Sequence, residues 1–275
     1  MELLAPAKVN LGLSVLGRRP DGYHELHTLF VALRVGDRLW VEAIPEGIEL
    51  EVRGQGLPAD TNNLVYKAAL AYLNAVGWPG GVKVILEKNL PLAAGLGGGS
   101  SDAAAVLRAL SRLYPAALEL PRLALGLGAD VPFFLGPSLA EGRGVGERLI
   151  PLPPLRAALV LVNPGIAVSA AEAYKGLTPE MWQPELDIAG VVEAIQVGEE
   201  PPYWNTLERS VFRMHPYLEA LKQELYRLGL RGVLMSGSGS TLFGLAREAD
   251  EAAHLAGVLR SKYPNFWVVA TETVS

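Results

Sequence analysis

The chain has 275 residues, of which 50% are hydrophobic and 19% are charged, so it has enough apolar material for a core and is not expected to be disordered. Its 24 basic and 29 acidic residues give a formal net charge of −5, which argues against sequence-independent nucleic-acid binding because that needs a basic face. Cysteine is absent, which excludes disulfides, thiolate metal sites and cysteine nucleophiles. The length fits one large domain or two modest ones.

No targeting or membrane segment is predicted. Residues 1–8 lack the basic start and apolar block of a signal peptide. Clear apolar runs, such as residues 157–162, fall far short of the ~20 residues that cross a bilayer. We therefore expect a soluble, cytoplasmic protein.

The N-terminal part predicts strands. Residues 7–13 alternate in polarity, which predicts a strand with Lys8 and Asn10 on one face. A turn at residues 18–22, containing Pro and Gly, precedes a second strand at residues 26–33.

A paired ribbon and a helix-rich stretch follow. Residues 38–43 and 48–53 are expected to pair with each other around the turn at residues 45–47. The next elements are a helix at 64–76, capped by Asn62 or Asn63 and ended by Gly77, a strand at 82–86 and a helix at 101–114.

The second half mixes short strands and helices. Strands are predicted at residues 158–162, 232–235, 241–245 and 266–271, and helices at 188–197, 216–228 and 250–263. This alternation indicates an α+β sandwich. The proline-rich stretch 151–154 is the candidate boundary between two domains, residues 1–152 and 153–275.

The strongest motif is a glycine-rich loop between a strand and an alanine-rich helix. Its residues are Pro91, Leu92, Ala93, Ala94, Gly95, Leu96, Gly97, Gly98, Gly99, Ser100 and Ser101. Glycines let backbone N–H groups approach a bulky ligand, and a helix N-terminus adds unpaired N–H groups and partial positive charge. Together they predict a phosphate site, to which the two serine hydroxyls can contribute.

Two other interpretations of this loop are weaker. A flexible turn with a serine helix cap does not account for the strand, helix and double serine occurring together. A dinucleotide site would use Gly95-x-Gly97-x-x-Ser100 with an acid after the next strand. Glu119 lies near that offset, but residues 115–121 do not resemble a strand. The loop is not a Walker A sequence, because no Gly-Lys-Ser/Thr follows.

The loop resembles the ATP-phosphate loop of the galactokinase, homoserine kinase, mevalonate kinase and phosphomevalonate kinase superfamily. Two further motifs match in chain order: Pro6-Ala7-Lys8-Val9-Asn10-Leu11 and Gly237-Ser238-Gly239-Ser240. Within the superfamily, Pro20-Asp21-Gly22-Tyr23-His24 and Gly128-Ala129-Asp130-Val131-Pro132 resemble the members that phosphorylate a cytidine diphosphate sugar alcohol in non-mevalonate isoprenoid synthesis.

The resemblance implies a two-lobed α+β kinase. Residues 1–152 would form an N-terminal lobe like ribosomal protein S5 domain 2, which binds ATP and carries the catalytic residues. Residues 153–275 would form a ferredoxin-like α/β sandwich that binds the substrate.

Lys8 and Asp130 are the catalytic candidates. Phosphoryl transfer needs somewhere for the hydroxyl proton to go, and a carboxylate such as Asp130 can accept it. Pro132 biases Val131 toward an extended conformation, which predicts an open rather than helical segment there. The resemblance implies that Asp130 is the base and Lys8 its partner at the reacting oxygen. Taken alone, each residue would be assigned to the surface.

On the ATP side, Asn63, Leu64 and Lys88 are candidates for contacts with the nucleotide. Mg²⁺ is expected as MgATP, with most ligands from phosphates and water. Ser100 or Ser101 is a candidate ligand from the protein. His24-x-x-His27 is not expected to bind zinc, because a spacing of three on a strand directs the side chains to opposite faces.

The resemblance also implies a substrate site. His24 would hydrogen-bond the cytosine edge while Tyr23 and Tyr174 stack on the base, and Asn10 with Asp130 would hold the sugar-alcohol hydroxyls. The loop of Gly237, Ser238 and Gly239 would close over the substrate diphosphate with its backbone N–H groups.

Three alternatives stay open. One is a kinase for mevalonate, phosphomevalonate or homoserine; another is an NAD(P)-dependent oxidoreductase; the third is a nucleotide-binding module without catalysis. The expected partners are small molecules, without nucleic acid, membrane or an obligate protein partner.

Overall fold

The structure, a computed structural model, describes residues 1–274 and divides into two compact units. The first unit comprises Met1–Ala7, Val35–Leu92 and Gly97–Pro137, and the second comprises Lys8–Arg34, Ala93–Leu96 and the chain from Ser138 onward. Two long strands, β1 (Glu2–Arg18) and β2 (His24–Ile44), contribute residues to both units. The functional boundary at residue 152 stays a prediction.

In the first unit, one predicted strand pairing differs from the observed one. Its sheet contains the second half of β2, β3 (Ile48–Arg53) and β4 (Gly81–Glu87), with β4 in the middle. β4 is antiparallel to β2 and parallel to β3, so the expected hairpin of β2 with β3 is wrong. β3, a helix and β4 instead form a βαβ unit, which places the more buried strand at the centre.

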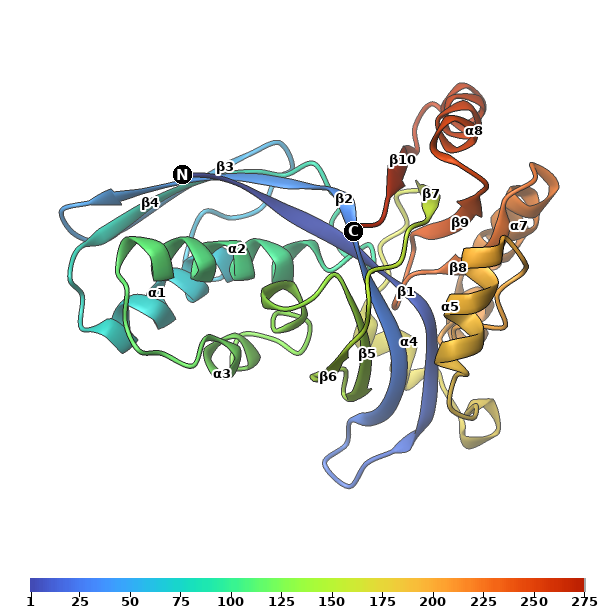
Figure 1. Cartoon of the computed structure of the whole chain (residues 1–275), viewed down its shortest axis with the longest axis horizontal. Helices are drawn as coiled ribbons and strands as arrows, with labels where there is room; N and C mark the ends of the chain where they lie inside the picture. The colour runs from blue at the N-terminus through green and yellow to red at the C-terminus, as the bar shows by residue number, and fades with distance from the viewer. Residues whose placement is uncertain (275) are drawn as a thin grey trace. The chain divides into compact units, whose positions relative to one another are not determined.

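Capping residues mark both ends of the first helix in this unit. In α1 (Leu64–Val76), Asn63 accepts the Val65 N–H, and Gly77 ends the helix at φ 76° and ψ 29°, as predicted. The second helix, α2 (Gly98–Leu113), packs beside α1 under the sheet and begins earlier than predicted (Figure 1). The short helices α3 (Leu120–Leu125) and η1 (Phe133–Leu135) were not predicted.

The second unit contains two strands that the sequence did not indicate, β5 (Leu139–Gly144) and β6 (Arg148–Pro151). β5 is antiparallel to the first half of β2, and β6 is antiparallel to β5. Because these short strands contain glycine and charged residues, they lack the alternation of apolar and polar residues that predicts a strand. β2 itself continues without a break through the two strands expected separately at its ends.

A four-stranded antiparallel sheet completes the second unit. It is built from β7 (Ala158–Asn163), β8 (Arg231–Met235), β9 (Leu242–Ala246) and β10 (Trp267–Glu272). Their spatial order is β10-β7-β9-β8. With helices after β7 and after β9, this is the βαββαβ arrangement of a ferredoxin-like sandwich, which confirms the expected fold class.

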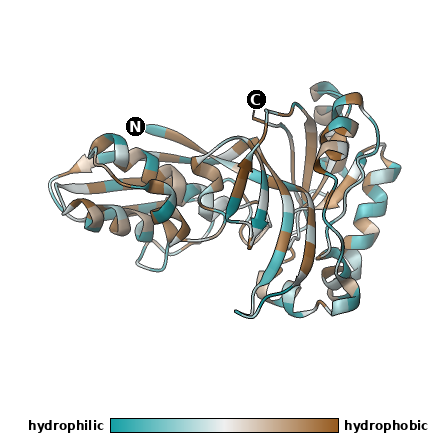
Figure 2. Ribbon diagram, turned by 60° about the horizontal axis from the view of Figure 1, so that its bottom comes forward, coloured by the Kyte–Doolittle hydropathy of each residue, from teal (hydrophilic) through white to brown (hydrophobic). Residues whose placement is uncertain are grey.

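Helices cover this sheet. α5 (Ile188–Val197), α7 (Pro216–Arg227) and α8 (Ala249–Lys262) agree with the predicted helices within a residue, whereas α4 (Ala170–Lys175), the short η2 (Pro179–Met181) and α6 (Glu208–Met214) were not predicted. α7 and α8 pack on the sheet (Figure 1). Hydrophobic and hydrophilic residues alternate along these elements in Figure 2, and the apolar ones form the core.

None of the helices within residues 1–274 combines the length and the apolar character that a membrane span requires. Apolar side chains of the strands and helices are buried against one another, which stabilises the fold.

The core of the first unit gives a stability prediction. Leu73 is fully buried on α1, so Leu73→Ala should lower the free energy of unfolding by about 2–5 kcal/mol through lost burial and a residual cavity. Lys67→Ala on the exposed side of the same helix is the control and should change stability by less than about 0.5 kcal/mol. Urea unfolding followed by circular dichroism measures both, and equal effects would contradict the assigned helix face.

Candidate active site

A series of buried polar side chains begins at Lys8 in the second unit. Lys8 Nζ donates to Asn10 Oδ1 at 2.8 Å, and Asn10 Nδ2 donates to Thr28 Oγ1 at 2.8 Å. Thr28 Oγ1 in turn donates to the Gly12 carbonyl at 2.7 Å. As predicted, Lys8 and Asn10 share one face of β1, but they are buried rather than solvated.

An aromatic ring adds to the environment of the lysine. Lys8 Nζ lies 5.3 Å from the centre of the Phe30 ring, within the range of a cation–π interaction. Phe30 packs against Gly142, where an added Cβ would lie 2.6 Å from the ring. The neighbouring strand β5 thus needs a glycine at this position to make room for the ring beside the ammonium.

The first part of the glycine-rich loop is held by the late loop between β8 and β9. Ser236 Oγ donates to the Gly95 carbonyl at 2.9 Å, and the Thr241 N–H donates to the Ala94 carbonyl. The Lys8 N–H donates to the Leu96 carbonyl at 2.9 Å. Within the second unit, the structure therefore brings the three predicted motifs together.

The late loop is itself fixed by a residue that the sequence did not single out. Asn205 Nδ2 donates to the carbonyls of Met235 and Gly237 at 2.7 and 2.8 Å, and Asn205 Oδ1 accepts the Leu207 N–H. Asn205 is buried. It holds the start of the segment that contains Gly237, Ser238 and Gly239. No motif in the sequence marks Asn205, because its partners lie about thirty residues away.

The rest of the glycine-rich loop belongs to the first unit, where it becomes the start of α2. Gly97 is the N-cap at φ 68°, a conformation that favours glycine. The first turn contains Gly98, Gly99 and Ser100, whose N–H groups have no partner within the helix. Ser101 Oγ is buried and has no hydrogen-bond partner among the described residues.

Beside this turn lies a buried ionic cluster. Lys88 Nζ is paired with Asp37 and, at 2.8 Å, with Asp102 Oδ2. Asp37 Oδ1 also accepts the N–H groups of Asn89 and Leu90, and all three ionic side chains are almost inaccessible. A Cβ on Gly98 would lie 3.3 Å from Lys88 Nζ, so the cluster packs directly against the helix start.

The cluster has one more acid than base, and burial changes how Asp102 titrates. Burial raises the pKa of Asp102 to about 7, the nearby Asp37 carboxylate adds to this, and Lys88 opposes it. Asp102 Oδ1 has no hydrogen-bond partner among the described residues. Lys88 was predicted as an ATP contact, whereas Asp37 and Asp102 were missed. A carboxylate inside the apolar strand β2 was the available signal for Asp37.

The other predicted ATP contacts lie at the start of α1. Asn63 Oδ1 caps the helix, and Asn63 Nδ2 donates to the Pro58 carbonyl at 2.9 Å. Leu64 is half-buried in the first turn. Both side-chain groups of Asn63 therefore have a structural role in shaping this loop.

Asp130 is half-buried in the first unit. The expectation of an open, extended segment around it is wrong, because residues 129–132 form turns that lead into η1. The Val131 N–H donates to the Gly128 carbonyl, and the Phe134 N–H donates to the Val131 carbonyl. Pro132, at φ −58° and ψ −35°, starts this turn rather than ending a strand.

The predicted cytosine-binding residues lie in the second unit. His24 and Tyr174 stack, with ring centres 5.2 Å apart and an angle of 21° between the planes. Burial, together with the charge of Arg18, lowers the pKa of His24 and favours its neutral form. Tyr23 is 66% exposed, so its ring is accessible. His27 points elsewhere, and its Nε2 contacts Glu141 at 3.0 Å.

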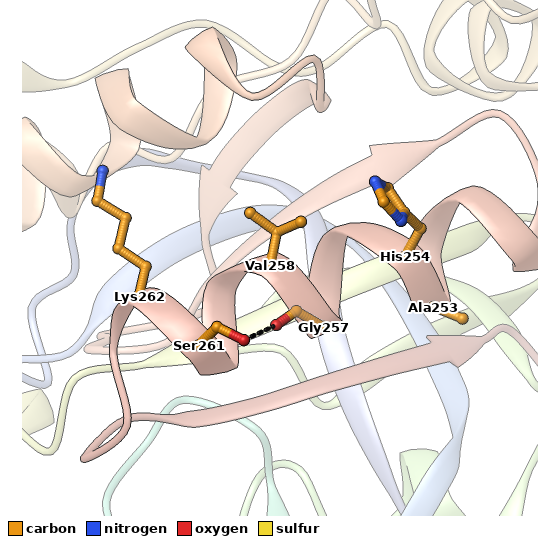
Figure 3. A pocket seen from close by; sticks show the side chains of 6 residues that line it. All are labelled: Ala253, His254, Gly257, Val258, Ser261 and Lys262. Carbon is orange, nitrogen blue, oxygen red and sulfur yellow. Dashed lines mark hydrogen bonds between the residues drawn. The ribbon is translucent and has the colours of Figure 1, made fainter.

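The described residues contain no group of three or more acidic or histidine side chains suited to holding a metal ion. One open pocket lies on the surface of α8 (Figure 3). It is lined by Ala253, His254, Gly257, Val258, Ser261 and Lys262. None of these is a predicted site residue, and a single helix face of this kind offers no set of converging polar groups.

A glycine-rich turn that opens a helix fits a phosphate site, as an enzyme that uses ATP requires. The sequence matches the family description "GHMP kinases N terminal domain" over residues 63–136 and "GHMP kinases C terminal" over residues 187–265. The chain belongs to the GHMP kinases and is an ATP-dependent phosphotransferase.

Two relatives that are at least 50% identical to this chain share one name. The 4-diphosphocytidyl-2-C-methyl-D-erythritol kinase of Thermus thermophilus is 55% identical over 95% of this chain and 93% of its own length. That of Deinococcus radiodurans is 50% identical over 98% of this chain and 91% of its own length.

Solved structures agree with the fold. A crystal structure of 4-(cytidine 5'-diphospho)-2C-methyl-D-erythritol kinase is 52% identical, covers 100% of both chains and has a TM-score of 0.92. Homoserine kinase from Cytophaga hutchinsonii has a TM-score of 0.72 at 19% identity, covering 100% of this chain and 94% of its own, which supports the fold alone.

The packing around two glycines predicts that replacing each by alanine will affect stability differently. Gly95 has φ +74°, and an added Cβ would lie 1.9 Å from the Ser236 carbonyl oxygen, so Gly95→Ala should destabilise the protein by about 2 kcal/mol or more. A Cβ on Gly99 in α2 meets nothing within 4 Å, so Gly99→Ala should be neutral or slightly stabilising. Thermal unfolding without nucleotide compares the two, and equal melting temperatures would contradict this packing.

The ionic cluster predicts a pH dependence of stability. Because the pKa of Asp102 is raised in the folded state, the folded protein binds more protons than the unfolded chain between about pH 4 and 7, and stability falls as pH rises through this range. Asp102→Asn cannot ionise. Its melting temperature relative to wild type should therefore increase between pH 5 and pH 8.

The matched control for this pH series is Asp60→Asn, because Asp60 is an exposed acid. Its melting temperature should differ from wild type by a constant amount at both pH values. A constant difference for Asp102→Asn as well would mean that Asp102 is ionised to the same extent when folded and unfolded.

Proposed function

We propose that this chain transfers the γ-phosphoryl group of ATP to the 2-hydroxyl of 4-diphosphocytidyl-2-C-methyl-D-erythritol, in the non-mevalonate route to isoprenoids. The observation that carries this proposal is the 55% identity, over 95% of the chain, with a kinase named for that substrate. The buried Lys8–Asn10 pair beside the glycine-rich loop supports the same reaction, because it offers a fixed cation near the place where phosphate is expected.

ATP binds along residues 91–101, with its phosphates on the N–H groups at the start of α2. Asn63, Leu64 and Lys88 lie on the adenosine side. The cluster of Lys88 with Asp37 and Asp102 makes the α2 start rigid before the nucleotide arrives.

Mg²⁺ accompanies ATP. The unpartnered hydroxyl of Ser101, with Ser100 next to it, fits a hard cation or a phosphate oxygen, since both need oxygen ligands or hydroxyl donors at this turn. When bound, the ion neutralises charge on the phosphates. The remaining ligands come from the nucleotide and water.

Transfer is direct and in line. Asp130 takes the proton from the acceptor hydroxyl, and Lys8 stabilises the negative charge that develops on that oxygen. The Phe30 ring and Asn10 hold the lysine ammonium in place before the substrate binds.

The cytidine end of the substrate binds in the second unit. His24, neutral at physiological pH, hydrogen-bonds the base edge, and the rings of Tyr23 and Tyr174 stack on it. Asn10 and Asp130 hold the hydroxyls, and the loop of Gly237, Ser238 and Gly239 binds the diphosphate. The stack of His24 on Tyr174 supports this arrangement, because one aromatic surface is already formed.

The two lobes of the enzyme have separate roles. Residues 1–152 act as the ATP-binding and catalytic lobe, and residues 153–275 act as the substrate lobe. The enzyme works in the cytoplasm on small molecules, without nucleic acid or an obligate protein partner.

A substrate panel tests the reaction. ADP release should require the cytidyl compound together with MgATP, and mevalonate, phosphomevalonate and homoserine should give no turnover. Turnover of one of these small alcohols, with none of the cytidyl compound, would replace the proposal by that activity. ATP binding without transfer to any alcohol would indicate a non-catalytic module.

The role of the base gives a mutational prediction. Asp130→Ala should reduce kcat by about 10²–10⁴-fold in the folded enzyme, because the acceptor proton loses its base. The control is Glu193→Ala on the exposed side of α5, which should keep wild-type turnover. Steady-state kinetics and thermal unfolding measure both variants, and near-normal turnover of a folded Asp130→Ala enzyme would refute the assignment.

A further inference from the structure

Thr28 lies behind the Lys8–Asn10 pair and has no place in the proposed reaction. It sits on β2, opposite Gly142 of β5, and its side chain is completely buried. An added Cβ on Gly142 would lie 3.0 Å from the Thr28 methyl group, so the residue is tightly packed. A buried hydroxyl on an otherwise apolar stretch of strand is costly unless its hydrogen bonds are needed.

The hydrogen bonds of Thr28 give the series a direction. A hydroxyl has one hydrogen, and the hydrogen of Thr28 Oγ1 is used on the Gly12 carbonyl at 2.7 Å. Toward Asn10, Thr28 Oγ1 therefore acts as an acceptor, and it receives the Asn10 NH₂ group at 2.8 Å. A carboxamide whose NH₂ end is fixed must direct its oxygen the other way, and that oxygen accepts from Lys8 Nζ.

The Gly12 backbone is the fixed end of this series. Gly12 has φ +101°, and an added Cβ there would lie 2.9 Å from Leu186, so its position is set by close packing. At the other end, an added Cβ on Gly237 would lie 3.4 Å from Asn10 Oδ1, which places the late loop beside the same oxygen. The orientation of one amide thus affects both the lysine ammonium and the contact with the late loop.

We propose that Thr28 is a positioning residue for phosphoryl transfer: by accepting from Asn10 while donating to Gly12, it fixes the Asn10 amide with its oxygen toward Lys8. This inference rests on the proposed roles of Lys8 and Asn10. Without the hydroxyl, the Asn10 NH₂ group has no acceptor behind it. The amide can then rotate toward another acceptor, and the hydrogen bond from Lys8 Nζ to Asn10 Oδ1 is lost.

The first test compares two substitutions at Thr28. Thr28→Val keeps the branched shape but removes the hydroxyl, and it should lower kcat about 10–100-fold while the KM for ATP changes less than about threefold. Thr28→Ser keeps the hydroxyl and should recover kcat to within about fivefold of wild type. A loss of packing alone would affect Thr28→Ser, which lacks the methyl group, at least as strongly as Thr28→Val.

A double-mutant cycle then asks whether Thr28 acts through Asn10. If it does, Thr28→Val combined with Asn10→Ala should have a kcat within about threefold of Asn10→Ala alone, because the effects of residues acting through one another are not additive. Independent effects, which multiply in the double variant, would overturn the inference. Thr28→Ala replaces Thr28→Val in the cycle should the valine variant fail to fold.

The outcome for this inference can be separated from the outcome for the proposed function. If Lys8→Ala and Asn10→Ala reduce turnover of the cytidyl substrate but folded Thr28→Val does not, the positioning role is wrong and the reaction stands. If Lys8→Ala leaves turnover unchanged, the catalytic assignment itself fails, and the positioning role fails with it.

Discussion

The close approach of Gly95 to Ser236 is the constraint on which the second unit's part of the site depends. The Ser236 hydroxyl and the Thr241 N–H bind the carbonyls of Gly95 and Ala94, and no side chain fits between the two backbones. Since the Leu96 carbonyl accepts from the Lys8 N–H, the same loop is also fixed to β1. Gly95, which lacks a Cβ, therefore lets residues 93–96 of the glycine-rich loop contact both the late loop and the backbone of Lys8 within the second unit.

The two buried lysines, Lys8 and Lys88, have different electrostatic surroundings. At Lys8, the ammonium donates to the Asn10 amide oxygen and lies over the Phe30 ring, so a hydrogen bond and a cation–π interaction hold it in place. At Lys88, two carboxylates pair with the ammonium, and one of them, Asp37, also accepts backbone N–H groups. The cluster around Lys88 is suited to building a rigid α2 start.

The sequence predicted what depends on local patterns and missed what depends on distant partners. α1 agrees with its predicted bounds because Asn63 and Gly77 signal its ends locally. The pairing of β2 with β3 was wrong because the sequence places the two strands next to each other, whereas β4, which follows α1, inserts between them. Among the buried polar residues, Lys8 and Asn10 were found from a motif. Asn205, Asp37 and Thr28 act through residues far along the chain, which periodicity and spacing do not encode.

Some of the places where the chain passes from one unit to the other lie within the motifs, whereas the passages at residues 34–35 and 137–138 do not. The chain enters the second unit between Ala7 and Lys8, and the glycine-rich loop enters it again at Ala93 and leaves it after Leu96. Covalent continuity therefore ties the lysine and the α2 N-cap to both units, with β1 and the loop as the connections. At the loop, only Ala93–Leu96 belong to the second unit, so the backbone enters and leaves it within four residues. This explains why the loop uses glycine at Gly95 and Gly97, whose positive φ values turn the backbone over a very short distance.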